Sequence, residues 1–298
     1  MFKEKKVWWK DSLNRSNRNE RVHGMMDFER KNVGEFLIID IILKEINLNE
    51  LKNPICIQGM PGTADIGKVA VDQLVAALRP EKIIEICFDD YPAGAIINDS
   101  LLYAPKAEIY LWKDPQEKQD IFLITADAQP MSARGIYGIS EYISNLMFKF
   151  GVKLIISLGG FPVEHCNNKY TKVFISGTSK EILTPYLEKP NIERISKGVV
   201  LGTNGLVPTL AKMKYGIEGI VLLAETNGYE AMQSDAYDLR ASITLMEILQ
   251  GHFDLPFEAA FTEEKIQGME LKLNAEKESI KEELGLNEGK VATLNYFG

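Results

Sequence analysis

The sequence predicts an α/β protein, in which a three-layer α/β/α domain with a mixed sheet precedes a C-terminal helix and a flexible tail. Short apolar runs that are typical of buried strands alternate along the chain with longer segments whose apolar residues recur at helical spacing. The strand-like runs at 107–112 and 120–126 are separated only by an Asp-Pro turn. This pair predicts an antiparallel hairpin inserted into the alternating order.

The elements of the domain are assigned in order from local signals. The predicted strands are apolar runs bounded by Gly, Pro, Asn or Asp, and lie at 35–46, 54–58, 82–88, 107–112, 120–126, 152–158, 172–176, 198–201 and 217–223. The predicted helices lie at 63–78, 133–150, 179–187, 206–215 and 230–250. Pro80 stops the first helix, Gly151 caps the second, and Gly159-Gly160-Phe161-Pro162 breaks the strand at 152–158.

Changes in composition divide the 298 residues into three parts. Residues 1–27 are polar, basic and aperiodic, and we expect a disordered or spurious extension, with Met25-Met26 as an alternative start and a basic arm for RNA or acidic partners as a weaker alternative. Residues 28–255 hold the alternating elements and are expected to be the core domain. Residues 256–298 are rich in Glu and Lys, and they predict a helix that leaves the domain, followed by a mobile tail.

Charge and cysteine content narrow the function classes. The net charge of −8 and the pI of about 5.2 disfavour a global nucleic-acid surface. No apolar run approaches the length of about 20 residues that is needed to cross a bilayer. The three cysteines are far apart and form no C-x-x-C pair, which indicates a reducing compartment. We therefore expect a cytoplasmic protein that binds neither nucleic acid nor membrane.

The turn after the strand at 54–58 is close to a nucleotide-binding loop. It reads Gly62-x4-Gly67-Lys68, but Val69 stands where a P-loop needs Ser or Thr to hold Mg²⁺. Asp65 would also place a carboxylate beside the phosphates. We interpret the glycines as a tight turn with close helix–strand packing, and we expect no cofactor.

Two further groups of polar residues are candidates for chemistry. Glu164-His165-Cys166 permits a metal site or a Cys–His nucleophile, but no second ligand pair lies at usable spacing, so a polar loop is favoured. Glu225 and Asp235 permit acid/base chemistry, but helix capping and a polar helix face are favoured. The sequence therefore predicts no catalytic constellation and no metal site.

Four glycine-centred motifs occur in a characteristic order. They are Gln58-Gly59-Met60-Pro61-Gly62 with Ile66-Gly67, Leu158-Gly159-Gly160-Phe161-Pro162, Asn204-Gly205-Leu206, and Leu222-Leu223-Ala224-Glu225-Thr226-Asn227-Gly228. In these motifs the chain resembles the PAC2 family of archaeal proteasome assembly chaperone homologues, over roughly residues 36–250. The resemblance implies a nucleoside-phosphorylase-like fold without an established catalytic site, formation of homo-oligomers, and ATP-independent binding of proteasome core-particle α-subunits.

The resemblance also implies a role for the end of the chain. Proteasome activators and several assembly chaperones dock through a terminal hydrophobic–tyrosine–any tripeptide, and the matching positions are Tyr296, Phe297 and Gly298. Phe297 lacks the tyrosine hydroxyl, and loss of one such hydrogen bond weakens docking by about 0.5–1.5 kcal/mol. Several tails acting together in an oligomer would compensate for this loss.

These observations predict an ATP-independent proteasome assembly chaperone or adaptor that binds α-subunits partly through its tail. The alternative is a small-molecule enzyme of phosphorylase-like or ligase type. Such an enzyme would use the loops after Gly59, Gly159 and Gly202, at the ends of strands. A scaffold whose tail serves another partner is a third reading.

Overall fold

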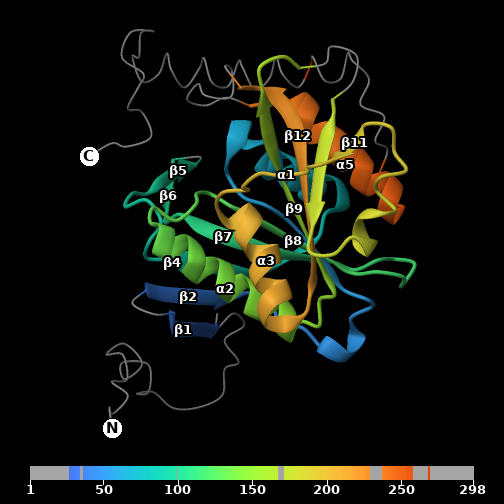
Figure 1. The fold of residues 1–298 in the computed structure, drawn as a ribbon. Helices are drawn as coiled ribbons and strands as arrows, with labels where there is room; N and C mark the ends of the chain where they lie inside the picture. Colours follow the sequence, from blue (N-terminus) through green and yellow to red (C-terminus); the bar gives the residue numbers. More distant parts are fainter. Residues whose placement is uncertain are drawn as a thin grey trace, which may run out of the picture.

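A large mixed sheet forms the centre of the molecule (Figure 1). The computed structural model describes residues 27–33, 36–98, 100–166, 171–228, 237–257 and 268. Across the sheet, the strands of this part are β1 (Asp27–Val33), β2 (Phe36–Ile42), β4 (Glu81–Phe88), β7 (Lys106–Trp112), β8 (Ile121–Ala126), β3 (Ile55–Gly59), β9 (Leu154–Val163), β12 (Glu218–Asn227), β10 (Val173–Gly177) and β11 (Ile192–Arg194). A separate two-stranded sheet consists of β5 (Ile96–Asn98) and β6 (Leu101–Tyr103).

Four neighbouring parallel strands lie in the middle of the sheet, and β10 and β11 at one edge also pair parallel. β8, β3, β9 and β12 are parallel neighbours, whereas β1, β2, β4, β7 and β8 pair antiparallel in succession and β10 pairs antiparallel with β12. Every residue of β3 and β8 is buried, as expected for strands covered on both faces. The mixed sheet and the antiparallel pairing of β7 with β8 are confirmed.

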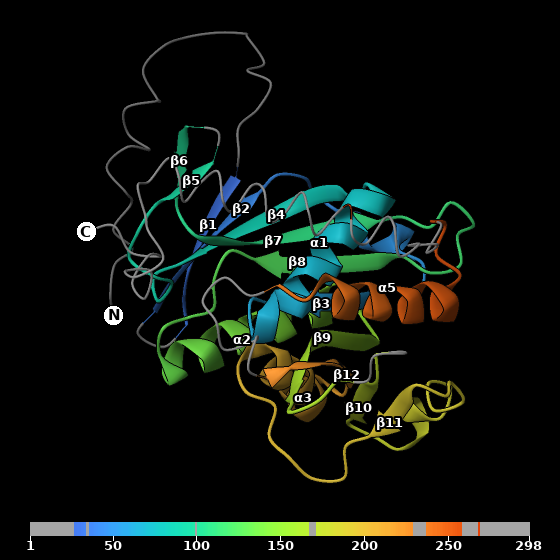
Figure 2. The same cartoon turned by 90° about the horizontal axis from the view of Figure 1, so that it is seen from above.

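Helices cover the two faces of the sheet (Figure 2). α1 (Ile66–Leu78) and α5 (Leu239–Phe253) pack on one face, and α2 (Ala133–Lys149) and α3 (Thr203–Tyr215) pack on the other. Short 3-10 turns lie at η1 (Leu48–Glu50), η2 (Thr63–Asp65) and η3 (Glu181–Leu183). The three-layer α/β/α prediction is therefore confirmed. No helix in the described part of the chain is both long and apolar enough to span a membrane.

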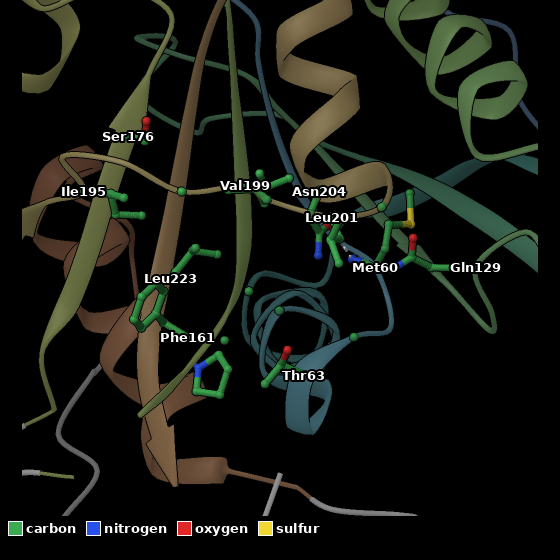
Figure 3. A pocket seen from close by; sticks show the side chains of 18 of the residues that line it. Met60, Thr63, Gln129, Phe161, Ser176, Ile195, Val199, Leu201, Asn204 and Leu223 are labelled. Carbon is green, nitrogen blue, oxygen red and sulfur yellow. Dashed lines mark hydrogen bonds between the residues drawn. The ribbon is translucent and has the colours of Figure 1, made fainter. Parts of the chain in front are cut away.

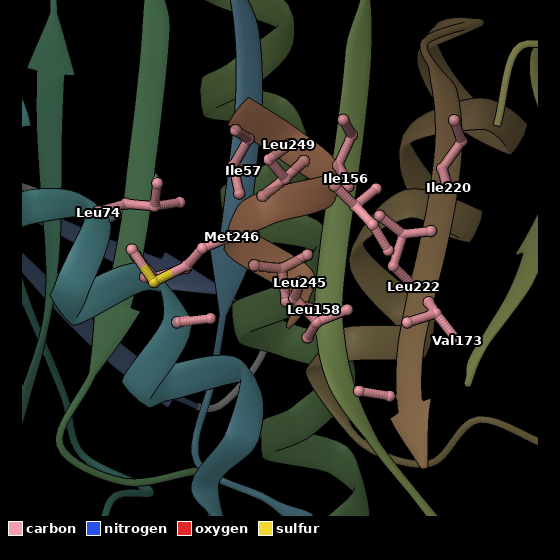
Figure 4. Packing of buried hydrophobic residues seen from close by; sticks show 14 of the residues in the cluster. Ile57, Leu74, Ile156, Leu158, Val173, Ile220, Leu222, Leu245, Met246 and Leu249 are labelled. Atoms are coloured by element: carbon pink, nitrogen blue, oxygen red, sulfur yellow. The ribbon is translucent and has the colours of Figure 1, made fainter. Parts of the chain in front are cut away.

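Each helical layer has its own hydrophobic core against the sheet. Under α1 and α5 the core combines strand and helix side chains, among them Ile57, Leu74, Ile156, Leu158, Ile220, Leu222, Leu245, Met246 and Leu249 (Figure 4). Under α2 and α3 it includes Phe122, Ile124, Ile139, Ile143, Met147, Ile155, Val207 and Ala211. The alternation of side chains along each strand therefore supplies both layers.

Several predicted elements are corrected. β9 does not break at Gly159 but continues to Val163, because this segment keeps its parallel pairing with β12. The strand predicted at 198–201 is an irregular loop, and the short strand β11 precedes it. The helix predicted at 179–187 is reduced to η3, because Pro185 lacks the backbone donor that a longer helix needs.

The predicted division into 1–27, 28–255 and 256–298 stays a prediction. Asp27, the first described residue, already begins β1. The helix predicted at 230–250 corresponds to α5, although residues 229–236 lie outside the described part. Of the predicted C-terminal helix and tail, only 256, 257 and 268 are described.

An ionic network lies on the face of β4 and β7 that is opposite to α2. Lys82 Nζ donates to Glu108 Oε1 at 2.6 Å, Tyr110 Oη donates to Glu108 Oε2 at 2.6 Å, and Lys106 Nζ lies 3.1 Å from Glu108 Oε1. Burial alone would raise the pKa of Glu108, but hydrogen bonds from Lys82, Tyr110 and Lys106 outweigh it and lower the pKa to about 2. These hydrogen bonds therefore stabilise the folded protein when the Glu108 carboxylate is ionised.

A Glu108→Gln substitution is expected to lower the free energy of unfolding at pH 7 by about 1 kcal/mol, after allowance for solvent screening. Because the folded pKa lies below the ordinary value of 4.5, the contribution is complete above about pH 4.5 and is lost as the pH falls towards 2. Urea unfolding across this range measures the difference. Glu193→Gln, which alters an exposed ion pair with Lys172, is the control. An equal effect at pH 7 and pH 2 would contradict the assignment.

Candidate functional site

The glycine motifs meet at the carboxyl ends of the parallel strands. The end of β3 continues into Met60 and Gly62, β9 contributes Gly159 and Gly160, and α3 follows Gly202. Together they enclose a cavity of about 770 Å³ (Figure 3). The three segments after Gly59, Gly159 and Gly202, which the sequence predicted as loops of a possible enzyme, therefore lie around one site, although the segment after Gly159 is the end of β9 and the segment after Gly202 is the start of α3.

Two glycines, which have no side chain, allow α1 to pack closely against the sheet beside this cavity. A Cβ atom at Gly59 would lie 1.9 Å from the carbonyl oxygen of Gly67, and one at Gly67 would lie 2.1 Å from the carbonyl oxygen of Leu158. The interpretation of these two glycines as close-packing residues is confirmed. The turn between them also places Ala64 and Asp65 in the left-handed region, at φ values of 47° and 45°, a backbone conformation that costs free energy for residues other than glycine.

Gln129 joins the β3 turn to α3. Its Nε2 donates to the carbonyl oxygen of Pro61 at 2.5 Å, and its Oε1 accepts from the backbone nitrogen of Thr203 at 3.1 Å and from Thr203 Oγ1 at 3.2 Å. One amide side chain thus satisfies a turn carbonyl and the first helical N–H of α3.

Two further amide side chains, those of Asn204 and Gln58, connect the same elements. Asn204 Oδ1 accepts from the backbone nitrogen of Met60 at 3.2 Å. Gln58 Nε2 donates to Ser157 Oγ at 2.6 Å and to the carbonyl oxygen of Thr203 at 3.3 Å. Gln58 is fully buried, and its Oε1 has no hydrogen-bond partner within the described ranges. These contacts fix β3, β9 and α3 relative to one another.

The near P-loop is arranged differently from a phosphate cradle. Lys68 Nζ pairs with Asp72 Oδ2 at 2.7 Å, and Thr125 Oγ1 donates to the other oxygen of Asp72 at 2.8 Å. Lys68 does not line the large cavity but a smaller hollow beside Asp127. Asp65 Oδ1 accepts from the backbone nitrogen of Gly62 at 3.1 Å, so a carboxylate already uses an amide that a phosphate would need.

The other sequence candidates have local roles or lie outside the described residues. Glu225 is buried, and its Oε1 accepts from the backbone nitrogen of Lys172 at 2.9 Å, at the edge between β10 and β12. Asp235 and the tripeptide Tyr296, Phe297 and Gly298 lie outside the described residues. Glu164, His165 and Cys166 follow β9, and nowhere in the described segments do three or more His, Cys, Asp or Glu side chains form a group able to hold a metal ion.

Cys56, a further thiol in the central strand β3, is fully buried. Burial raises the pKa of this thiol above its ordinary value. The thiolate form, which is the nucleophile, is therefore disfavoured at neutral pH, as expected for a structural cysteine.

Sequence reasoning missed the role of the three amide side chains. Asn204 and Gln58 were visible only as members of glycine motifs, and Gln129 belonged to no motif. Their partners lie 68 to 145 positions away in the chain, and no local pattern records such a distance.

The fold and the cavity define a class of protein: a three-layer α/β/α protein in which closely packed glycines border a cavity at the ends of the parallel strands. The family model of the PAC2 family matches residues 56–277, and the chain belongs to this family. It is 30% identical to the uncharacterized protein MJ1210 of Methanocaldococcus jannaschii over 195 residues, which are 65% of this chain and 74% of that one.

Solved structures share the fold. The crystal structure of PbaB of Pyrococcus furiosus, described as an archaeal proteasome activator, matches with a TM-score of 0.69 and 24% identity, over 80% of this chain and 98% of that one. The structure of PbaA of the same organism, described as an archaeal homolog of proteasome-assembly chaperone, matches with a TM-score of 0.61 and 22% identity, over 78% and 90% of the two chains.

Proposed function

We propose that this protein is an ATP-independent proteasome assembly chaperone or adaptor that binds the α-subunits of the core particle. The observation that carries the proposal is membership of the PAC2 family over residues 56–277, together with a fold similar to those of PbaB and PbaA. Independence from ATP is supported by Val69 at the Mg²⁺ position and by the pairing of Lys68 with Asp72.

The proposed contact is the C-terminal tripeptide of Tyr296, Phe297 and Gly298. In this proposal the aromatic ring of Phe297 enters a pocket between α-subunits, and the carboxylate of Gly298 pairs with a lysine beside it. A single tail binds weakly because Phe297 lacks a hydroxyl. A homo-oligomer would present several tails to the ring at once and gain affinity through their effective concentration.

Deletion of Tyr296–Gly298 is expected to abolish capture of α-subunits in a pull-down without ATP. The physical reason is the loss of both the ring and the terminal carboxylate. Phe297→Tyr is expected to strengthen capture by up to about tenfold, because it restores one hydrogen bond. Lys68→Ala is the control and is expected to capture α-subunits like the unmodified chain, with or without ATP.

The possible results test the chaperone function and the assignment of the tail as the contact separately. If the full chain captures α-subunits and the deletion variant captures them equally well, the tail assignment is wrong and the contact lies elsewhere. If the full chain captures neither free α-subunits nor assembled core particles, the chaperone function is wrong.

A further inference from the structure

The cavity at the carboxyl ends of β3 and β9 has the size and position of a small-molecule site. Its volume of about 770 Å³ lies within the usual range for ligand pockets, roughly 300–1,000 Å³. In open α/β sheets such pockets occur outside the carboxyl ends of parallel strands, between connections that leave towards opposite faces. Here α1 and α3, which lie on opposite faces of the sheet, both begin at the cavity.

Asn204 presents an unused hydrogen-bond donor to this cavity. The residue is only 7% exposed, and its Oδ1 is already occupied by the backbone nitrogen of Met60. Its Nδ2 has no hydrogen-bond partner among the residues that the structure describes, and Figure 3 shows it directed into the open centre of the cavity. This nitrogen is open to the cavity and is not one of the fully buried side-chain atoms that lack a partner, so a ligand with an oxygen acceptor can reach it.

The walls of the cavity are largely apolar. Phe161 and Leu223 form one side of it, and Val199 and Leu201 form the other (Figure 3). Val199 and Leu201 are 84% and 82% exposed, which is unfavourable for aliphatic side chains that line the same hollow. An apolar ligand body between these walls would cover both side chains.

The electrostatics favour one negative charge on the ligand. Lys197 is the only charged side chain that lines the cavity in the described part of the chain. The first turns of α1 and α3, at Gly67 and Asn204, border the cavity, and the positive end of each helix dipole faces an anion placed there. The carboxylate of Asp65, which already accepts the Gly62 amide, disfavours a more highly charged phosphate.

We propose that this cavity binds a small molecule in which a carboxylate is joined to an apolar body. Asn204 Nδ2 donates to a carboxylate oxygen, Lys197 attracts the charge at the rim, and Val199, Leu201 and Leu223 contact the body. Binding of a ligand in this cavity does not depend on binding to the proteasome.

The test is a titration of the full chain with phenylacetate and with 4-methylpentanoate, followed by nuclear magnetic resonance. Saturable shifts of the Asn204 side-chain amide and of the Gly159 and Gly160 backbone amides are expected, with a dissociation constant on the order of 1 mM for ligands of this size. Phenylacetamide, which has the same body without the charge, is expected to bind about tenfold more weakly.

Asn204→Asp is the decisive variant, because it keeps the oxygen that accepts from Met60 and replaces the donor with a negatively charged oxygen that repels a carboxylate. It is expected to weaken phenylacetate binding by about tenfold or more. Asn145→Asp makes the same chemical change at a residue whose Nδ2 donates to Tyr215 Oη at 2.9 Å, away from the cavity, and should bind phenylacetate like the unmodified chain.

A second variant protects the test against a folding defect of Asn204→Asp. Gly159→Ala would place a methyl group 3.7 Å from Asn204 Nδ2 and 3.0 Å from Leu223 Cδ2, so it obstructs the same position sterically. It should also weaken binding at least severalfold. Absence of saturable binding by both carboxylates up to about 10 mM would overturn the inference. So would equal binding of phenylacetamide, or unchanged binding in both Asn204→Asp and Gly159→Ala.

Discussion

Gly67→Ala is expected to destabilise the protein by about 3 kcal/mol or more. In an isolated helix the same change would stabilise by up to about 1 kcal/mol, because alanine is the better helix former. Here the new Cβ would lie 2.1 Å from the carbonyl oxygen and 2.7 Å from the carbonyl carbon of Leu158. These are backbone atoms of the central strand β9, which cannot rotate away, so α1 must shift from the sheet. The steric cost therefore outweighs the gain in helix propensity.

The comparison with Gly251→Ala makes this prediction specific. Gly251 is also helical, lies on the exposed side of α5, and an added Cβ would meet only the flexible end of Lys189, at 3.2 Å. That variant is expected to be neutral or stabilised by up to about 1 kcal/mol. Urea unfolding of both variants measures the difference. Equal stabilities would mean that α1 is not held against β9 as closely as the structure indicates.

The glycines at the β3–α1 crossing illustrate what the sequence could predict. Gly59 and Gly67 follow a strand and open a helix, and Val69 and Asp65 argued against a nucleotide. Close packing was then the physical reason left for two glycines at this spacing, and the structure confirms it. The strands and helices with clear apolar periodicity, such as β4, β8, α1 and α2, were likewise predicted, because their residues determine their own conformation.

Elements whose conformation depends on distant partners could not be predicted in this way. Gly159 and Pro162 are strand breakers by local preference, but pairing with β12 keeps this segment in β9. The loop around Val199 has the composition of a strand, but it pairs with no strand among the described residues. The cavity is a further example. The orientation of the Asn204 amide is set by its hydrogen bond to Met60, which lies 144 positions away in the chain, so the sequence around Asn204 does not reveal it.

Leu222→Ala is expected to lower the free energy of unfolding by about 2–5 kcal/mol. Leu222 is fully buried and lies in the core beneath α1 and α5, where Figure 4 shows it among Ile220, Leu158 and Val173. Truncation removes buried methyl groups and leaves a void that the rigid sheet can close only in part.

Leu102→Ala is the matched control, because Leu102 lies in β6 and is 71% exposed; its loss should change stability by less than about 0.5 kcal/mol. Urea unfolding measures both variants. The alternation of β12 adds a second check, since the next residue, Leu223, lines the cavity while Leu222 does not. At a urea concentration where both proteins are folded, Leu222→Ala should therefore bind phenylacetate like the unmodified chain. Two results would contradict this arrangement of β12 side chains between core and cavity. One is a Leu222→Ala variant as stable as the unmodified chain, and the other is a folded Leu222→Ala variant that no longer binds phenylacetate.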